Sequence, residues 1–516
     1  MRAPGAKLTA NCVGRGNKLI RNQTEPNVRS STWSKSNNIR ESDHLQKYLV
    51  AHDSSRPSFL GARGGIARRI GGASLDPLTA NAQVSNHKVI PQSLEASRLK
   101  SLQTLGVLCG FGAGAWLGAA EAPTKFVQAG VSPIVVSLLM VIGVFLARWS
   151  LPALIRGTGQ IRLDVREAPH LIVWGVLAGC LWAVANTMTI FAIRDIGLSI
   201  AFPLWNINSL LGIFWGFALF NELRDAGRLR WVSVIGGALL MFAGATLLAF
   251  TSSGQMAAEH STRGILAALC AGILWGTMYI PYRKAYLTGM NPLSFVAFFT
   301  IGELGMMTVL ALSYGGGPSV LKHELLNARP ALFWLMLGGF VWVIGDLFQQ
   351  YAAKYVGISR GIPLSNSNQL WGLLWGILVF GELRGRGSWL HAQVIGGSLL
   401  MAAGAGAIAL STVRGKEHVR WDEAAQRERQ RYDVDANYVQ AGLEGKFKAD
   451  GDSQSGRNWL DWLLVTLATT VFVWLAVLAR APKMTLNWNA LIALCAVMLI
   501  FLACCGAALW KVTRFN

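Results

Sequence analysis

The sequence predicts an all-α integral membrane protein, with a ten-helix core of two inverted five-helix repeats followed by a C-terminal two-helix hairpin. Three observations predict this class. Of the 516 residues, 52% are hydrophobic and only 14% are charged, which is too apolar for a soluble chain. Apolar runs of about twenty residues, the length that crosses a hydrocarbon core of about 30 Å, recur from residue 102 onward. One long stretch also occurs twice, 160 residues apart.

The duplicated stretch spans two hydrophobic segments and the turn between them. Its first copy begins at Gly197 and its second at Gly357. The residue types kept at the 160-residue offset are those of Gly197, Ser199, Pro203, Leu204, Asn206, Asn208, Gly212, Trp215, Gly216, Phe220, Glu222, Leu223 and Arg224. Because five predicted spans separate the copies, the second copy enters the bilayer upside down relative to the first. This is the inverted repeat of many secondary transporters.

The polar N-terminal region, residues 1–100, is basic, rich in Ser, Asn and Gly, and lacks a hydrophobic period. We therefore expect it to be disordered. A targeting segment and a start codon placed too far upstream are the alternatives for this region. The predicted core spans are 102–120, 132–150, 170–192, 198–220, 231–250, 264–281, 292–313, 331–352, 358–380 and 392–412. The first repeat thus occupies residues 101–255 and the second 261–413.

A charged linker, residues 414–457, follows the second repeat and precedes the predicted transmembrane hairpin at 458–511. Its charges are balanced, and we expect a solvated helix around Ala424–Tyr438. The predicted loops on one side of the core hold eleven Lys and Arg residues, Arg148, Arg283 and Arg360 among them, and those on the other side hold seven. This excess predicts that both termini and the linker are cytoplasmic.

Polar side chains inside the apolar spans are the candidate site, because such groups are retained in a bilayer mainly where they face a cavity or a partner. Asp346 lies well inside the eighth span, and Glu303 lies at the middle of the seventh. Asp346 is the first choice for the coupling or ligand carboxylate and Glu303 the second. The other candidates for substrate binding or coupling are Asn186, Gln349, Gln350, Asn206, Asn208, Asn366, Asn368, Gln369, Trp182 and Trp342.

Two prolines, Pro203 and Pro363, each remove a backbone hydrogen bond, and we expect them to break the two repeated spans. Amides, a carboxylate and indole faces together suit a neutral, hydroxyl-rich ligand. The alternatives are that the asparagines join neighbouring helices and that the tryptophans form interfacial belts. For Glu222 and its repeat mate Glu382 we expect local ion pairs, with Arg224 and Arg384, at the membrane surface.

The sequence lacks the residues that several other functions require. The cysteines have no metal-type spacing, the histidines are isolated, and no Walker A sequence or nucleophile elbow occurs. The net charge of +20 is spread over loops and tails, where membrane lipid is the expected partner. We therefore expect no enzyme activity, no metal, no cofactor and no nucleic-acid partner.

The sequence resembles the drug/metabolite transporter superfamily, and within it the glucose and rhamnose porters. The resemblance covers residues 102–412 and rests on Trp182 and Asn186 in the third span, GLSIAFPL at 197–204, GISRGIPLSNSNQ at 357–369, and the Phe-Gly-Glu-Leu sequence that ends at Leu383. It implies proton-coupled uptake of a sugar across the cytoplasmic (inner) membrane, by alternating access of two inverted halves.

The predicted function is therefore a secondary active transporter of a monosaccharide or related small polyol, with proton symport. Three alternatives remain: an exporter of a drug or metabolite, a non-transporting membrane sensor that signals through the linker, and a membrane-embedded transferase.

Overall fold

The chain is mainly helical over the residues that the computed structural model describes, which are 92–120, 122–123, 131–196, 201, 204–249, 261–381, 387–411, 413, 415–444, 457–479 and 486–515. Over these residues it has no strand, and ten of its helices are long and apolar enough to cross a membrane. The predicted all-α integral membrane class is thus confirmed. The first 91 residues, Pro203 and Glu382 lie outside the described residues.

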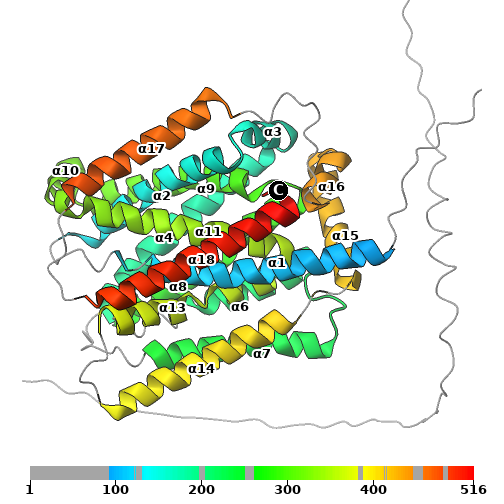
Figure 1. Ribbon diagram of the computed structural model, residues 1–516, viewed down its shortest axis with the longest axis horizontal. Coiled ribbons are helices and arrows are strands. Elements are labelled where there is room, and N and C mark those ends of the chain that lie inside the picture. Colours follow the sequence, from blue (N-terminus) through cyan, green and yellow to red (C-terminus); the bar gives the residue numbers. More distant parts are fainter. Residues whose placement is uncertain are drawn as a thin grey trace, which may run out of the picture. The chain divides into compact units, whose positions relative to one another are not determined.

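The first half of the core consists of α1 (Gln92–Ala119), α2 (Pro133–Ile155), α4 (His170–Ile196), α6 (Ile207–Phe220) and α7 (Arg228–Ala249), with the short α3 (Gly159–Glu167) between α2 and α4. The second half consists of α8 (Ser261–Leu287), α9 (Pro292–Tyr314), α11 (Leu332–Val356), α12 (Ile358–Ser365), α13 (Asn368–Leu374), the π-helical η5 (Trp375–Val379) and α14 (Ser388–Leu410). Helix α10 (Pro318–Asn327) and η4 (Arg329–Ala331) connect α9 to α11. Figure 1 shows these helices packed side by side.

The second helix of each half begins with the same local device. Ser132 accepts a hydrogen bond from the backbone N–H of Val135, and Pro133 opens α2. Asn291 likewise accepts from the N–H of Leu293, and a proline opens α9. A side-chain cap satisfies an N–H that lacks a helical partner, and proline at the first position has no N–H to satisfy. Both helix starts are therefore specified locally by the sequence.

Contacts within the core occur in matched pairs. A Cβ atom added to Gly179 of α4 would lie 1.9 Å from the carbonyl oxygen of Phe299 on α9. At Gly339 of α11, 160 residues further on, it would lie 2.0 Å from the carbonyl oxygen of Met140 on α2. Only glycine permits so close an approach of two helix backbones. Helix α4 therefore packs on α9 in the way that α11 packs on α2.

Helices α7 and α14, which hold equivalent places in the two halves, pack on each other. A Cβ added to Gly237 would lie 2.7 Å from the carbonyl oxygen of Gly404, and one added to Gly244 would lie 2.6 Å from that of Gly397. Because the residue number rises along α7 as it falls along α14, the two helices run antiparallel where they touch. An inverted repeat requires this arrangement, and the inversion across a bilayer stays a prediction.

The two repeated spans, predicted at 198–220 and 358–380, are not long continuous helices. In the second half, α12 ends at Ser365, residues 366–367 form a turn, and α13 begins at Asn368. Pro363 lies inside α12, in its last turn. In the first half, Asn206 forms a turn directly before α6. Each half therefore has an interrupted helix with asparagine at the interruption.

The chain continues after the core with α15 (Gly415–Tyr432), α16 (Ala436–Glu444), α17 (Trp459–Leu478) and α18 (Trp488–Thr513). Helix α17 packs mainly on α2, and α18 packs mainly on α1 and η5 (Figure 1). The carboxylate of Asp461, near the start of α17, accepts from the backbone N–H of Thr158 at 2.8 Å. The N–H of Asn487, before α18, donates to the carbonyl of Val379 at 3.1 Å. The last two helices thus contact different parts of the core.

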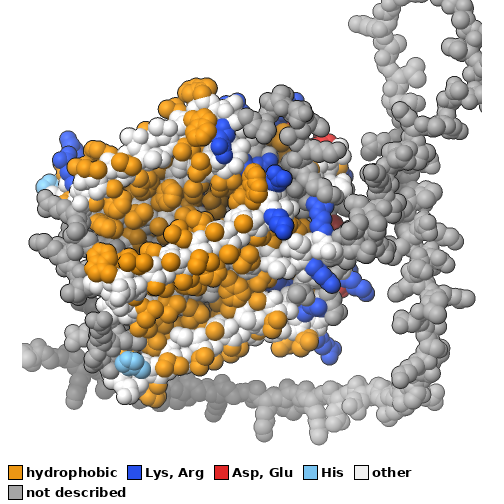
Figure 2. Space-filling model, in the orientation of Figure 1, with side chains coloured by type: hydrophobic (Ala, Val, Ile, Leu, Met, Phe, Trp, Pro, Cys, Tyr) orange, Lys and Arg blue, Asp and Glu red, His pale blue; other side chains and the backbone are white. Residues whose placement is uncertain are grey.

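The two linker helices, α15 and α16, lie at one end of the core (Figure 1). Figure 2 shows hydrophobic side chains over the middle of the helices and most of the visible Lys and Arg side chains near that end. An apolar middle with a basic end is the distribution expected of a membrane protein whose basic end faces the cytoplasm.

Candidate functional site

A buried ion cluster joins three helices at the centre of the site. Arg148 of α2 donates to Oε2 of Glu303 on α9 at 2.8 Å and to Oδ2 of Asp346 on α11 at 2.7 Å. All three side chains are at most 1% exposed. The structure therefore brings together the two carboxylates that the sequence singled out, and it adds a cation between them.

The prediction that Arg148 belongs to an inner loop is wrong. The span was predicted to end at residue 150, but α2 continues to Ile155, so Arg148 lies about two turns inside the helix. Arg283 and Arg360, which the same count placed in loops, are also buried. The sequence did contain a usable signal, because two carboxylates inside spans require a cation. Arg148 interrupts the apolar run FLARWSL and was available to supply it.

The cluster is enclosed by polar and aromatic side chains. Gln350 donates to the second oxygen of Asp346 at 3.0 Å, and the hydroxyl of Tyr286 donates to Gln350. The guanidinium carbon of Arg148 lies 4.2 Å from the ring centroid of Phe299 and 5.1 Å from that of Trp342. Both oxygens of Asp346 are therefore engaged, and the cation is held over aromatic faces.

The cluster contains one cation for two carboxylates. With all three groups ionised its net charge is −1, and with a proton on either carboxyl group the charge is zero. Among the described residues, Oε1 of Glu303 has no hydrogen-bond partner. Burying an uncompensated charge costs several kcal/mol. The cluster is therefore neutral only with one proton on a carboxyl group, and the carboxylate oxygen without a partner among the described residues belongs to Glu303.

The amide side chains of the two interrupted helices form a second cluster. Asn366 donates to Oδ1 of Asn208 at 3.2 Å and to the hydroxyl of Ser209 at 2.5 Å. The cavity beside them has a volume of about 10 Å³ and is lined by Asn206, Ser209, Leu210, Ala238, Met241, Phe242, Ala245, Pro363, Asn366, Gln369 and Met401. This is room for about one water molecule. The amide of Asn366 is thus satisfied within the cluster, whereas Oε1 of Gln369 has no hydrogen-bond partner among the described residues.

The remaining candidates connect or flank these clusters. Gln349, next to the Gln350 of the ion cluster, donates to the hydroxyl of Ser365 at the end of α12 at 2.6 Å. Trp182 packs edge-on against Trp342, with ring centroids 5.3 Å apart.

Two of the predicted asparagines, Asn186 and Asn368, make contacts outside the two clusters. Asn186 donates to the hydroxyl of Ser137 at 2.9 Å and so joins α4 to α2. Asn368 is the first residue of α13. A Cβ atom added to Gly118 of α1 would lie 2.4 Å from the carbonyl oxygen of Asn368, so the two backbones pack closely here.

Glu222 has a role that the sequence analysis did not predict. Its carboxylate accepts from the N–H groups of Ile358 and Ser359, the first two residues of α12, at 3.1 and 2.8 Å. It also pairs with Arg283 of α8 at 2.6 Å. The predicted local pair with Arg224 is therefore wrong. A buried carboxylate at a helix N-terminus satisfies free N–H groups and interacts favourably with the helix dipole.

The linker is tied to the same short helix. Arg360 of α12 donates to both carboxylate oxygens of Glu417 on α15, at 2.7 and 3.0 Å, and both side chains are buried. The N–H of Leu223 donates to Glu417 at 3.0 Å. Trp421 of α15 lies under the guanidinium of Arg283, 4.2 Å from ring to cation. The linker helix, predicted to be solvated, is docked on both halves of the core.

Three further groups at this end, Asp164, Tyr438 and His418, have shifted pKa values. Tyr438 of α16 donates to Asp164 of α3 at 2.8 Å, and the N–H of Asn291 donates to the same carboxylate at 3.2 Å. Burial raises the pKa of Asp164, and it raises the pKa of Tyr438 well above its usual range. Burial lowers the pKa of His418 on α15 to about 4. Over the described residues, no group of three or more His, Cys, Asp and Glu side chains could hold a metal ion.

Comparison with known proteins identifies relatives of this chain. Residues 262–404, which include Glu303, Asp346 and Asn366, match the EamA-like transporter family. The glucose uptake protein GlcU of Staphylococcus xylosus is 25% identical over 227 residues, 44% of this chain and 73% of the relative. A protein of Listeria innocua serovar 6a named for sugar uptake is 23% identical over 230 residues, 44% of this chain and 75% of the relative.

One solved crystal structure is also similar. It aligns with 59% of this chain and 96% of its own, at 18% identity and a TM-score of 0.40.

Proposed function

We propose that the chain is a secondary active transporter of a monosaccharide or a related small polyol, driven by proton symport. The match of residues 262–404 to the EamA-like transporter family supports a transport function. Similarity to proteins named for glucose and sugar uptake supports the substrate class. We place the protein in the cytoplasmic membrane with the basic linker end inside, as the gathering of Lys and Arg at that end favours (Figure 2).

The single observation that carries the proton coupling is the charge balance of the ion cluster. Arg148 compensates one of two buried carboxylates, so the cluster is neutral only when the other holds a proton. We assign that proton to Glu303, because Asp346 has both oxygens engaged and Glu303 has one oxygen without a partner among the described residues. This reverses the order of the two carboxylates that the sequence suggested.

The substrate site in this proposal is the amide cluster at the two helix interruptions. Its asparagines and Gln369 can pair with hydroxyl groups, but the present cavity of about 10 Å³ holds no sugar. Binding therefore requires the two halves to separate at α6 and α12, which is the opening step of alternating access. Gln349 and Gln350 link the amide cluster to the ion cluster, and protonation and opening can be coupled through them.

Uptake of labelled sugars into vesicles, with and without an inward proton gradient, tests the proposal. Wild-type protein is expected to accumulate at least one sugar only with the gradient. In Glu303→Gln or Asp346→Asn the remaining carboxylate is balanced by Arg148, so both variants should lose accumulation and keep counterflow exchange. Asp433→Asn, at an exposed position in the turn after α15, is the matched control and should behave as wild type.

Three results would count against the proposal in different ways. Accumulation that persists in both cluster variants would remove the proton role of Arg148, Glu303 and Asp346. Accumulation without any gradient would rule out proton symport but would still be consistent with sugar transport. Absence of exchange for every sugar in the panel, in a protein that inserts and folds, would remove the substrate class.

A further inference from the structure

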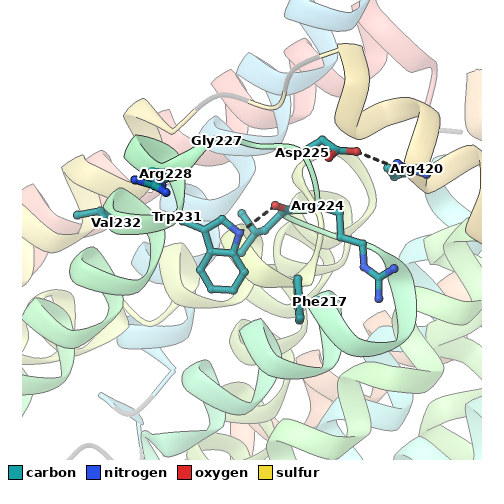
Figure 3. Close-up of a pocket in the computed structure, with 9 residues that line it drawn as sticks. Phe217, Arg224, Asp225, Gly227, Arg228, Trp231, Val232 and Arg420 are labelled. Carbon is teal, nitrogen blue, oxygen red and sulfur yellow. Dashed lines mark hydrogen bonds and ion pairs between the residues drawn. The ribbon is translucent and has the colours of Figure 1, made fainter. Parts of the chain in front are cut away.

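A basic pocket lies away from the ion cluster and the amide cluster, where the linker meets the first half of the core. It has a volume of about 650 Å³. Three segments of the chain form it: the end of α6, the turn from α6 to α7 with the first turn of α7, and α15 (Figure 3). Its lining residues are Phe217, Leu223, Arg224, Asp225, Gly227, Arg228, Trp231, Val232 and Arg420. Neither the ion cluster nor the amide cluster contributes to it.

The pocket has an excess of positive charge. Three arginines line it against one carboxylate, Asp225. Arg420 pairs with Asp225 at 2.8 Å and also with Glu423 at 3.0 Å. Arg224 and Arg228 are exposed and form no ion pair with an acidic side chain among the described residues. Helix α7 begins at Arg228, so the positive end of its dipole lies at the pocket. The guanidinium of Arg224 lies over the ring of Phe217, 5.4 Å from the centroid, and neither arginine is neutralised by an acidic side chain among the described residues.

One wall of the pocket is aromatic and rigidly held. The rings of Phe217 and Trp231 meet edge-on, with centroids 5.2 Å apart. The indole N–H of Trp231 donates to the carbonyl of Leu223 at 3.0 Å, which fixes the ring. Figure 3 shows Arg224 and Arg228 on opposite sides of this tryptophan. A tryptophan with a satisfied N–H and an apolar face is typical of the boundary between hydrocarbon and headgroups.

Exposed apolar side chains continue away from the pocket. Phe217 is 37% exposed, Val232 is 67% exposed, and Leu229, on the first turn of α7, is 81% exposed. Such side chains on the outer surfaces of two apolar helices suit contact with acyl chains. The pocket therefore lies where a bilayer-facing apolar surface meets the basic end of the molecule.

We propose that this pocket binds the phosphate group of an anionic phospholipid, with Arg224 and Arg228 as its main contacts and the acyl chains along α6 and α7. A soluble anion would use the arginines alone, whereas a phospholipid also uses the aromatic wall and the exposed apolar residues.

Native mass spectrometry of the full-length protein in detergent, titrated with phosphatidylglycerol or phosphatidylcholine, tests the site. Each arginine near a membrane surface contributes about a factor of five in affinity for anionic lipid. Arg224→Gln/Arg228→Gln should therefore bind the first phosphatidylglycerol about 30-fold more weakly than wild type. The matched control is Arg162→Gln/Arg166→Gln, which removes two exposed arginines from α3 and should bind as wild type.

The site is overturned if the double variant binds phosphatidylglycerol as tightly as the control, or if wild type binds phosphatidylcholine equally well. Displacement of phosphatidylglycerol by an equal concentration of inorganic phosphate would show that the pocket holds a soluble anion and would overturn the lipid assignment. If the double variant does not fold, Arg228→Gln alone decides the question, with an expected weakening of about fivefold. Binding is measured without transport, so failure of the proposed transport function leaves this test intact.

Discussion

Replacing Arg148 with methionine is expected to cause a large loss of stability. Methionine fills much of the same volume with apolar atoms, so the main change is electrostatic. The substitution leaves Glu303 and Asp346, both fully buried, without the cation that each contacts within 2.8 Å. Removing one partner of a buried ion pair costs about 3–5 kcal/mol. Loss of the stacking on Phe299 and Trp342 adds about 0.5–2 kcal/mol.

The assay is unfolding of the purified protein by sodium dodecyl sulfate in mixed micelles, followed by circular dichroism. The informative comparison is with the triple variant Arg148→Met/Glu303→Gln/Asp346→Asn. The triple variant leaves no uncompensated charge in the core, so it should recover most of the loss. Because the three side chains contact one another, the three single effects should not add.

Two results would refute this reasoning. A loss below about 1 kcal/mol in Arg148→Met, a value typical of exposed ion pairs, would mean that the cluster is solvated. A triple variant as unstable as Arg148→Met would mean that packing of the guanidinium, and not charge, holds α2 against α9 and α11.

Three further predictions concern the linker and the helix contacts. Glu417→Ala leaves Arg360 buried without its carboxylate, so linker docking should weaken by about 3–5 kcal/mol and hydrogen exchange in α15 should accelerate; unchanged exchange would contradict the pairing. Burial lowers the pKa of His418 to about 4, whereas the pKa is about 6.5 in the unfolded chain. The contribution of the buried neutral imidazole to the free energy of unfolding is therefore fully present above pH 6.5 and is lost as the pH falls below it. Between pH 7.5 and 5 the thermal midpoint should fall more in wild type than in His418→Gln. Gly179→Ala should cost about 1–3 kcal/mol or more in detergent unfolding, whereas Gly236→Ala, in open space, should be tolerated.

The fold class could be predicted because its determinants are local in sequence. Apolar runs of spanning length, and N-caps such as Asn291 before Pro292, set each helix with little help from distant residues. Asp346 and Gln350 could be placed together because residues four apart share a helix face. Helix ends are harder, since the last turns depend on packing. Arg148 stood two residues from the predicted end of its span and was counted with the inner loop, whereas α2 continues for seven residues beyond it.

The partners of buried charges could not be predicted, because they come from distant parts of the chain. Glu222 is separated from Arg283 by a whole helix and from the start of α12 by most of the second half. The partner that the sequence suggested for Glu222 was Arg224, two residues further along the chain, which is exposed. For the linker, balanced charge predicted solvation, since charged helices are usually solvated. Its Glu417 is instead buried because an arginine from α12 satisfies both of its oxygens.

These contacts make α12 the element through which the linker can influence transport. Glu222 holds the N–H groups at the start of this short helix, Glu417 of the linker holds Arg360 in its first turn, and the amide cluster begins at Asn366 directly after its end. If α12 moves to open the substrate cavity, the pair of Arg360 and Glu417 must either separate or move together. Separation would leave a buried charge unpaired, at about 3–5 kcal/mol, so moving together costs less. Helix α15 should therefore follow α12 during the transport cycle, and whatever fixes α15 should also restrain the opening of the cavity.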